Sequence, residues 1–350
     1  MSVPKKKFDF LVFVGRFEPF HVAHQAVLRK ALAEAELVIV LVGSSNHSRT
    51  IKNPFTYQER ANMINASFDD TDESSDRYVI APLPDQTYNM QKWVTSVQKI
   101  VEEQVYMHFG PDTGLKGGIV GHSKDESSFY LKLFPQWEIV DHPMNDVLHA
   151  TDIRKLYFEK NIKYIRAVVP PGVLESLESF RDTSMYDNLV EEYEFIQKYK
   201  KAWEAAPYAP TFVTTDAVVI QSGHILLVKR KAAPGKGLWA LPGGFLNQNE
   251  TIEDGVFREL REETRLKVPL PVLKGSVKAT AVFDAPGRSL RGRTITHAFL
   301  IELAPGPLPK VKGDDDADEA KWELISHIKE ELMYEDHYHI IQKLIGKGSV

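Results

Sequence analysis

The chain has 350 residues, of which 43% are hydrophobic and 26% charged, and its formal net charge is −5 at pH 7. This composition is that of a globular protein and excludes a disordered, collagen-like or coiled-coil chain. The length is typical of two domains. The sequence contains no cysteine, which excludes disulfides, thiolate nucleophiles and zinc–sulfur sites.

The distribution of apolar and charged residues excludes two further classes of partner. Apolar runs such as residues 37–42 are far shorter than the roughly 18 residues of a membrane span. The lysines at residues 5–7 are not followed by the apolar stretch and cleavage site of a secretory signal. Neither half of the chain is basic, as a nucleic-acid binder would be. We therefore expect a cytoplasmic protein without membrane or nucleic-acid partners.

The first half of the chain alternates apolar, β-rich runs with a helical pattern. A helix is expected at residues 24–35, and strands are expected at residues 8–14, 37–43, 78–81, 116–120 and 137–140. Continuous apolar strands that alternate with helices indicate a parallel sheet covered on both faces. We expect one domain at residues 1–185, a helical linker with prolines at residues 186–210, and a second domain at residues 211–350.

The pattern after Pro210 is that of a mixed α/β domain. Residues 211–220 and 224–229 flank Gln-Ser-Gly and are typical of a β-hairpin. A loop rich in glycine and proline precedes a strong helix, for which Thr251 is the expected N-cap. Further strands are expected at residues 272–282 and 294–302, followed by a C-terminal helix.

The string GRFEPFHVAH, residues 15–24, joins the first strand to its helix. A loop in this position is where α/β sheets bind nucleotides. Gly15 permits a close approach of the backbone to a ligand, and His21 and His24 are spaced so that both can donate to one phosphate. Either histidine alone is better explained as a structural residue, but the complete string favours a phosphate site.

This string resembles the signature GRFxPFHxGH of the nucleotidyltransferase superfamily, in its nicotinamide mononucleotide adenylyltransferase branch, with Ala23 in place of a glycine. Three later segments resemble further motifs of that branch in the same order. They are GSSNHSRT with KNPFT and Glu-Arg (residues 43–60), GHSKDES (residues 121–127) and HATDIR (residues 149–154), where the family usually has ISxTxIR. The resemblance covers about residues 8–180 and implies a Rossmann-like domain that makes NAD and pyrophosphate from ATP and nicotinamide mononucleotide.

Adenylyl transfer is catalysed mainly by positioning and by neutralising developing charge, so it requires cations and hydrogen-bond donors. The guanidinium groups of Arg16, Arg49 and Arg154 suit phosphate. The resemblance implies that His21, His24 and Arg154 act in catalysis. It implies that further residues bind the substrates, namely Gly15, Arg16, Phe17, Arg49, Lys124, Asp125 and Thr151.

The nicotinamide side of the expected site is assigned to Asn89 and Trp93. The family stacks an aromatic ring on the pyridine and reads its carboxamide with nearby polar groups, and residues four apart share a helix face. An ordinary core position for Trp93 is the alternative.

The second domain contains Gly244, Glu250 and the run RELREETRL at residues 258–266. These residues resemble the Nudix hydrolase box at every fixed position except Arg265, where the family has glycine. The resemblance covers about residues 210–340 and implies an α/β/α sandwich with a mixed sheet. Because that glycine follows the helix, we expect a left-handed backbone at Arg265.

Three carboxylates of this run, Glu259, Glu262 and Glu263, share one helix face. A Glu-rich helix is usually a solvated face, but the complete motif favours a metal site. Converging carboxylates repel one another unless a hard cation binds them, so Mg²⁺, or Mn²⁺ in its place, is the expected cofactor, with Glu250 as a further ligand. Such a site can activate water, and Glu262 and Glu263 are therefore also expected to be catalytic.

Residues 283–293 resemble a segment of ADP-ribose pyrophosphatases and assign substrate contacts to Arg288 and Arg293; a basic surface loop is the alternative. The acidic run at residues 314–319 is interpreted as solvated. We therefore expect a bifunctional enzyme of NAD metabolism that acts on ATP and nicotinamide mononucleotide, releases NAD, and hydrolyses ADP-ribose. Two alternatives remain open: another phosphate acceptor for the first domain, and a ligand-sensing second domain without hydrolysis. The sequence also leaves open a homo-oligomer and the choice between nicotinamide and nicotinate mononucleotide.

Overall fold

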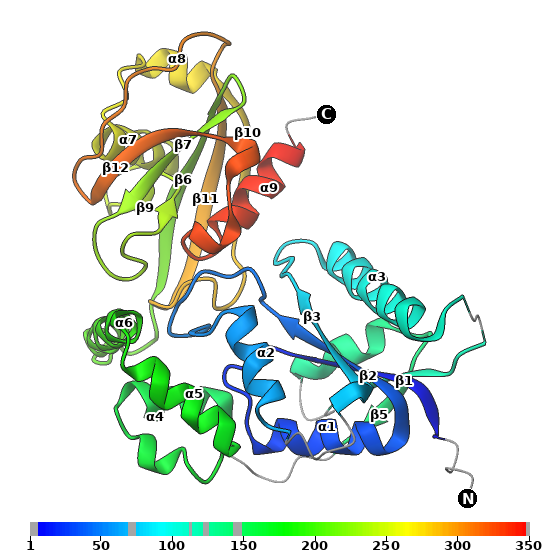
Figure 1. Ribbon diagram of the computed structural model, residues 1–350. Helices are drawn as coiled ribbons and strands as arrows, with labels where there is room; N and C mark the ends of the chain where they lie inside the picture. The colour runs from blue at the N-terminus through cyan, green and yellow to red at the C-terminus, as the bar shows by residue number, and fades with distance from the viewer. Residues whose placement is uncertain (1–5, 69–74, 112–113, 122–125, 143–148, 348–350) are drawn as a thin grey trace, which may run out of the picture. The chain divides into compact units, whose positions relative to one another are not determined.

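The computed structural model describes residues 6–68, 75–111, 114–121, 126–142 and 149–347 (Figure 1). The chain divides into two compact units, Met1–Val190 and Glu191–Val350. The strands of the first unit are β1 (Phe8–Gly15), β2 (Ala35–Gly43), β3 (Tyr78–Leu83), β4 (Gly117–Gly121) and β5 (Glu138–Asp141). Its helices are α1 (Val22–Glu34), α2 (Tyr57–Asn65), α3 (Met90–Phe109), α4 (Ala150–Phe158), α5 (Pro171–Arg181) and the first turns of α6 (Ser184–Lys201).

The strands of the first unit form a parallel sheet in the order β3-β2-β1-β4-β5. β1 therefore lies in the middle, and its last residue, Gly15, is opposite Val42 near the end of β2. Parallel strands all end at one edge of the sheet, so the loops that follow β1 and β2 are neighbours. This is the Rossmann-like parallel sheet that the sequence predicts.

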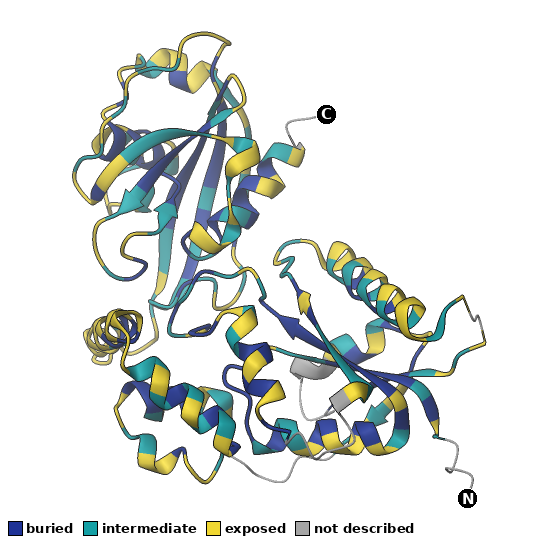
Figure 2. Ribbon diagram, viewed as in Figure 1, coloured by how far each residue is buried: buried dark blue, intermediate teal, exposed yellow. Residues whose placement is uncertain are grey.

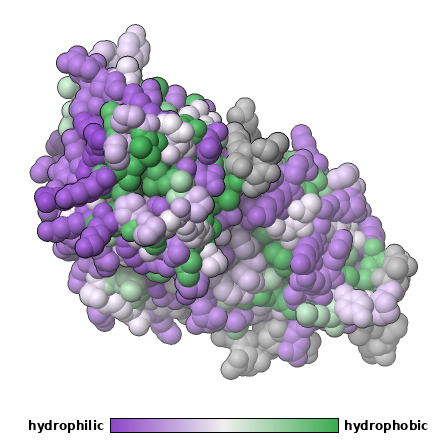
Figure 3. All heavy atoms as spheres, turned by 90° about the horizontal axis from the view of Figure 1, so that it is seen from above, coloured by the Kyte–Doolittle hydropathy of each residue, from purple (hydrophilic) through white to green (hydrophobic). Residues whose placement is uncertain are grey.

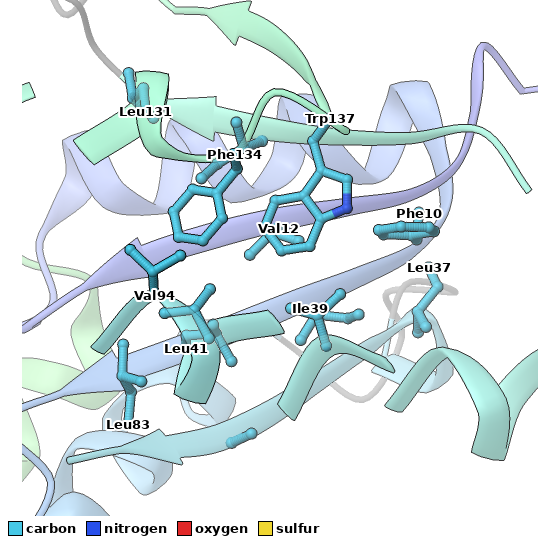
Figure 4. Close-up of a cluster of buried hydrophobic side chains, with 14 residues drawn as sticks. Phe10, Val12, Leu37, Ile39, Leu41, Leu83, Val94, Leu131, Phe134 and Trp137 are labelled. Atoms are coloured by element: carbon cyan, nitrogen blue, oxygen red, sulfur yellow. The ribbon is translucent and has the colours of Figure 1, made fainter. Parts of the chain in front are cut away.

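Successive side chains of β1 point to opposite faces of the sheet, and both faces are covered. Phe10 and Val12 belong to a buried cluster that includes Val94, Val97 and Val101 of α3 (Figure 4). The cluster also contains Leu131 of the 3-10 helix η2 (Glu126–Leu133) and the residues Phe134 and Trp137 that follow it, whose rings stack with their centroids 4.9 Å apart. Phe13, on the other face, contacts the ring of His24 in α1.

The second unit contains β6 (Thr211–Gln221), β7 (His224–Arg230), β8 (Trp239–Ala240), β9 (Gly243–Phe245), β10 (Val277–Phe283), β11 (Arg293–Glu302) and β12 (Ala317–Leu324). Its helices are α7 (Ile252–Thr264), α8 (Leu270–Gly275) and α9 (His337–Lys347). The strand order is β10-β11-β6-β7-β12, while β8 pairs with β7 and β9 with β6. The sheet is mixed, as expected, because β6 and β11 are parallel and the other pairs are antiparallel.

Helix α7 covers one face of this mixed sheet. Its buried side chains Val256, Phe257 and Leu260 pack on Ala217 and Val219 of β6 in one hydrophobic cluster. Helix α9 contacts β10 and β11. The inner strands β1, β2, β6 and β7 are largely buried, the outer strands β5, β10 and β12 are mostly intermediate or exposed, and the helices alternate buried and exposed residues (Figure 2).

One sequence-based expectation in this domain was wrong, and one strand was not expected. The strand expected at residues 272–282 is instead the helix α8 followed by β10, because Pro269 is the N-cap and a further proline occupies the first turn, a position that proline favours. In addition, β12 extends from within the acidic run and pairs with β7. The acidic residues Asp318 and Glu319 of β12 are nevertheless exposed, as an outer strand permits.

Helix α6 passes through the boundary between the two units. Within the first unit the Tyr186 hydroxyl donates to the Tyr157 carbonyl over 2.8 Å. Within the second unit the Gly235 N–H donates to the Glu192 carboxylate over 3.0 Å, and the ring of Tyr199 packs on another aromatic ring, that of Phe212. The expected linker is therefore helical up to residue 201.

On the face shown in Figure 3, hydrophilic side chains surround smaller hydrophobic patches. Among the helices of the described part, none is both long and apolar enough to cross a bilayer.

Candidate active sites

The loop after β1 has a strained and tightly packed backbone. Phe17 is buried and adopts a left-handed conformation with φ 56°, which is uncommon for a residue other than glycine. Its ring lies so close to Gly15 that a Cβ on Gly15 would be 2.7 Å from a ring carbon. The same ring contacts that of His24 edge-on, with centroids 5.0 Å apart. Gly15 and Phe17 thus shape the loop that presents the histidines.

The two predicted histidines lie together at the start of α1. His21 is the N-cap, and its ring stacks on that of His24 with centroids 3.6 Å apart. The His21 backbone N–H donates to His24 Nδ1 over 3.4 Å. Because Nδ1 of His24 accepts this bond, a neutral His24 ring carries its proton on Nε2, where it can be donated to a ligand.

Both histidines are neutral at neutral pH. Burial, together with the neighbouring His149, lowers the pKa of His21 to about 4. Burial among aromatic rings and the proximity of His21 lower the pKa of His24 well below its usual value. Neutral imidazole rings can serve as uncharged hydrogen-bond donors, and the positive charge near them comes from arginines.

Arg154 links the predicted late motif to the histidine loop. It is buried, and its guanidinium donates to the Glu18 carbonyl over 2.6 Å and to the Thr151 hydroxyl over 3.2 Å. Burial and the nearby charge of Arg16 lower the pKa of Arg154 to about 10. Arg16 itself donates to the side chain of Asn53 over 3.3 Å. Two cations held this close together suit a polyanionic ligand.

Arg49 has a different environment from the other predicted arginines. Its guanidinium forms a bidentate ion pair with Glu59 at 2.7 and 2.8 Å, and it donates to the Pro54 carbonyl. Glu59 also accepts from the N–H of Thr56, the N-cap of α2. The partners of Arg49 therefore belong to the same motif, residues 43–60, and its contact with substrate stays a prediction.

The two residues predicted for the nicotinamide side, Asn89 and Trp93, lie at the start of α3. Asn89 is the N-cap of α3, and its side chain accepts from the Lys92 N–H over 3.0 Å. Its amide oxygen therefore stabilises the start of α3, and its backbone carbonyl accepts from the Trp93 N–H over 3.1 Å. The assignment of both residues to the nicotinamide ring stays a prediction. Trp93 is half-buried against the rings of Tyr130 and Phe134. The remaining two expected ligands, Lys124 and Asp125, lie outside the described residues.

The predicted acidic site of the second unit is organised around Arg258. Thr251 caps α7 as expected. About two turns later, Arg258 forms a bidentate pair with Glu250 at 2.6 and 2.9 Å, and it donates to Glu259 and Glu262 over 2.8 Å each. The hydrogen bonds from Arg258 lower the pKa of Glu250 to about 2. The guanidinium thus gathers three carboxylates that would otherwise repel one another.

Glu259 and Glu263 complete the carboxylate face of α7. Glu263 is buried and accepts from the Gly243 N–H over 2.9 Å. The Glu259 carboxylate lies against Gly244, where an added Cβ would be 2.6 Å from its oxygen. Burial raises the pKa of Glu259, and it raises the pKa of Glu263 to about 8.

These carboxylates fit a hard divalent cation. The donors are oxygen atoms, and two of them are buried where their charged forms are disfavoured unless a positive charge is added. Glu259, Glu262 and Glu263 would hold the cation, and Glu250 is bound to Arg258. Glu259 and Glu262 accept from Arg258 as well, and the assignment of Glu250 to the metal stays a prediction.

Arg265 adopts the left-handed conformation expected for the missing glycine, with φ 50°. Its guanidinium pairs with Asp314 at 2.5 Å, and both side chains are largely exposed. The chain therefore keeps the glycine geometry with an arginine, at a backbone cost of about 1 kcal/mol.

The two arginines expected to contact ADP-ribose have protein partners. Arg288 is buried in a bidentate pair with Asp336 at 2.8 and 2.9 Å, both side chains being less than 10% exposed. In this conformation Arg288 supports the loop, and a ligand contact would require the pair to open. Arg293 donates to the Asp284 carbonyl and is partly exposed.

Sequence reasoning missed three residues of the sites: Glu18, Arg60 and Asp336. Glu18 and Arg60 form an ion pair of 3.1 Å with both side chains 1% exposed. The motif strings contained Glu18 and Arg60, but burial, which gives them their role, has no signal in a single sequence. Asp336 lies 48 residues from Arg288, so no local pattern connects them.

The parallel sheet with its histidine loop and the mixed sheet with its glutamate helix define a nucleotidyltransferase-type domain followed by a Nudix domain. A family model described as cytidylyltransferase-like matches residues 12–155, and one described as NUDIX domain matches residues 210–344.

Relatives of both halves and of the whole chain are known. A nicotinamide/nicotinic acid mononucleotide adenylyltransferase of Acinetobacter baylyi is 39% identical over 53% of this chain and 94% of its own length. An ADP-ribose pyrophosphatase of Methanocaldococcus jannaschii is 37% identical over 39% of this chain and 73% of its own length. A crystal structure of a bifunctional NMN adenylyltransferase/ADP ribose pyrophosphatase from Francisella tularensis, complexed with AMP and Mn ion, is 36% identical, covers 97% of this chain and 99% of its own, and has a TM-score of 0.88. The chain belongs to this family of bifunctional NMN adenylyltransferase/ADP-ribose pyrophosphatases.

Proposed function

We propose that residues 1–185 transfer the adenylyl group of ATP to nicotinamide mononucleotide, giving NAD and pyrophosphate. The observation that carries this proposal is the meeting of two neutral histidines with Arg16 and Arg154 at the end of β1. An oxygen of the mononucleotide phosphate attacks the α-phosphorus of ATP, and the bond from that phosphorus to the bridging oxygen breaks. No protein nucleophile takes part.

In this reaction the side chains have separate tasks. Arg16 and Arg154 neutralise the phosphates, while the proton on Nε2 of His24 is donated to an α-phosphate oxygen as negative charge develops there. A neutral histidine performs this task without having to be desolvated as a cation, and its tautomer is set by the His21 N–H. Mg²⁺ would accompany the triphosphate and shield its charge.

We propose that residues 211–350 hydrolyse ADP-ribose to AMP and ribose 5-phosphate. The supporting observation is the gathering of Glu250, Glu259 and Glu262 around Arg258, beside the buried Glu263. Bound Mg²⁺, held by the carboxylates of α7, would polarise the diphosphate and lower the pKa of a water molecule. Water then adds to one phosphorus, and the diphosphate bond breaks.

One assay tests both proposals. The purified protein is incubated with MgCl₂ and either ATP plus nicotinamide mononucleotide or ADP-ribose, and the products are separated by chromatography. We expect NAD with pyrophosphate from the first mixture, and AMP with ribose 5-phosphate from the second. Nicotinate mononucleotide, pantetheine phosphate and flavin mononucleotide are compared as acceptors, and a preference for either of the last two would contradict the first proposal.

The alternative for the second unit is a module that binds ADP-ribose without cleaving it. Binding of ADP-ribose in calorimetry, without AMP formation over a series of Mg²⁺ and Mn²⁺ concentrations, would favour this alternative. The carboxylate face of α7 argues for hydrolysis, because a purely sensing module has no use for metal ligands.

A further inference from the structure

Two left-handed residues other than glycine occupy the turns that follow β1 and β2. They are Phe17, with φ 56°, and Ser44, with φ 51°. Both turns lie at the edge of the sheet that carries the histidine loop. Residues held in such a conformation persist only where surrounding contacts determine the backbone, and they concentrate at functional sites.

One buried arginine provides those contacts. Arg60 of α2 is 1% exposed and donates to the carbonyls of Arg16 and Gly43 over 2.7 Å each, and to that of Ser44 over 3.1 Å. The Arg16 carbonyl belongs to the peptide that enters Phe17, and the other two flank the second left-handed position. The planar fork of a guanidinium can reach three carbonyls at once, which an ammonium group cannot do in the same geometry.

The counter-ion of Arg60 connects the same cluster to Arg154. Glu18 pairs with Arg60 at 3.1 Å, and its carboxylate also accepts from the Phe55 N–H over 3.1 Å. The backbone carbonyl of Glu18 accepts from Arg154. A single buried ion pair thus joins the histidine loop, the turn after β2, the start of α2 and the late arginine.

We propose that Arg60, with Glu18 as its counter-ion, is a positioning residue for adenylyl transfer: it fixes the two left-handed turns that aim His21, His24 and Arg16 at the phosphates. This inference rests on the adenylyltransferase function proposed above. Arg60 is itself buried behind the turns, so it acts through the residues that touch the substrate.

The first test is Arg60→Lys in the full chain. Lysine keeps a charge for Glu18 but loses the fork, so we expect kcat of NAD synthesis to fall at least about tenfold while KM for ATP changes less, since misplaced donors lose transition-state contacts. ADP-ribose hydrolysis by the same preparation should be unchanged. The matched control is Arg77→Lys, because Arg77 also donates to backbone carbonyls, those of Leu32 and Ala35, at the opposite end of the strands.

A second comparison separates positioning from folding. Arg60→Met leaves Glu18 buried without its partner and should lower the melting temperature, whereas the double variant with Glu18→Gln removes both charges and should recover much of it. We expect synthesis to remain at least about tenfold low in the double variant, because the carbonyls still lack their donor.

The outcomes distinguish this inference from the proposed function. If the wild-type protein makes no NAD, the proposed function fails. If the wild type makes NAD but Arg60→Lys loses no more activity than Arg77→Lys, or the double variant regains wild-type kcat, the positioning role is wrong.

Discussion

The two sites of this chain solve opposite electrostatic problems. In the first, buried cations are bonded to carbonyl oxygens: Arg154 to that of Glu18, and Arg60, which also pairs with the Glu18 carboxylate, to those of three turn residues. In the second, Glu250, Glu259 and Glu262 are bonded to Arg258, and the buried Glu263 lies near Glu259. Each site therefore carries an excess of the charge opposite to that of its expected ligand.

The comparison also shows how each site holds like charges together before a ligand arrives. The first site lowers its own positive charge by keeping both histidines neutral through burial. The second lowers its negative charge by sharing Arg258 among several glutamates. In the first site, Arg16 and Arg154 are bonded to neutral oxygens, whereas a cation bound in the second would compete with Arg258 for Glu259 and Glu262.

The largest expected effect tests that competition. Glu262→Gln keeps the shape of the side chain but removes one negative ligand, so ADP-ribose hydrolysis should fall by orders of magnitude, with partial rescue at higher Mg²⁺. Both activities are measured on one preparation over a Mg²⁺ series. Glu253→Gln is the control, because Glu253 lies on the same helix, is exposed and pairs with Lys274. Intact hydrolysis in Glu262→Gln would contradict the metal site, and loss of NAD synthesis would contradict independent sites.

The next effect concerns the neutral donors of the first site. His24→Ala should lower NAD synthesis by about a hundredfold or more, the scale for one lost preorganised donor, and leave ADP-ribose hydrolysis unchanged. His108→Ala, at an exposed position near the end of α3, controls for the loss of an imidazole. Near-normal synthesis by folded His24→Ala protein would show that this residue has only a packing role.

A smaller effect tests the nicotinamide side. If Trp93 stacks on the pyridine ring, Trp93→Ala should weaken binding of nicotinamide mononucleotide by about 1–3 kcal/mol and leave ATP binding nearly unchanged. Titration calorimetry with each substrate measures the two losses. Equal weakening of both, together with a lower melting temperature, would identify Trp93 as a core residue packed on Tyr130 and Phe134.

The smallest effect is a dependence of local stability on pH. Because the pKa of His21 falls from 6.5 to about 4 on folding, the unfolded chain binds more protons in this window, and stability decreases as pH falls through it. We expect α1 to lose about 1–2 kcal/mol between pH 7 and pH 5. Amide hydrogen exchange of α1 measures this, and His21→Asn, which keeps an N-cap residue, should lose less. The same loss in both proteins would exclude His21 as the cause.

The sequence predicted the two folds, and it predicted which candidate residues lie together, because the signals were local. The strand–loop–helix string placed His21 and His24 beside each other, and helical spacing placed the glutamates on one face of α7. A missing glycine predicted the left-handed backbone at Arg265, which the structure confirms at φ 50°.

The remaining features depend on contacts between residues distant in sequence. A basic loop residue such as Arg288 has the same sequence signal whether it binds a ligand or, as here, is buried against Asp336. The same holds for Arg60, whose carbonyl partners in the two turns lie 16 to 44 residues away. The strand predicted at residues 272–282 was wrong for a local reason. Two prolines begin the helix α8, but the apolar residues that follow are also typical of a strand.

Helix α6 determines how the two activities could be divided between two polypeptides. A cut at the boundary between Val190 and Glu191 would divide a helix of 18 residues into residues 184–190 and 191–201. Helices shorter than about 12 residues are marginal in water without packing. Each half of the helix is anchored in its own unit, by Tyr186 and by Glu192. A split protein that duplicates residues 184–201 on both polypeptides would therefore keep every anchor and give each enzyme a complete helix.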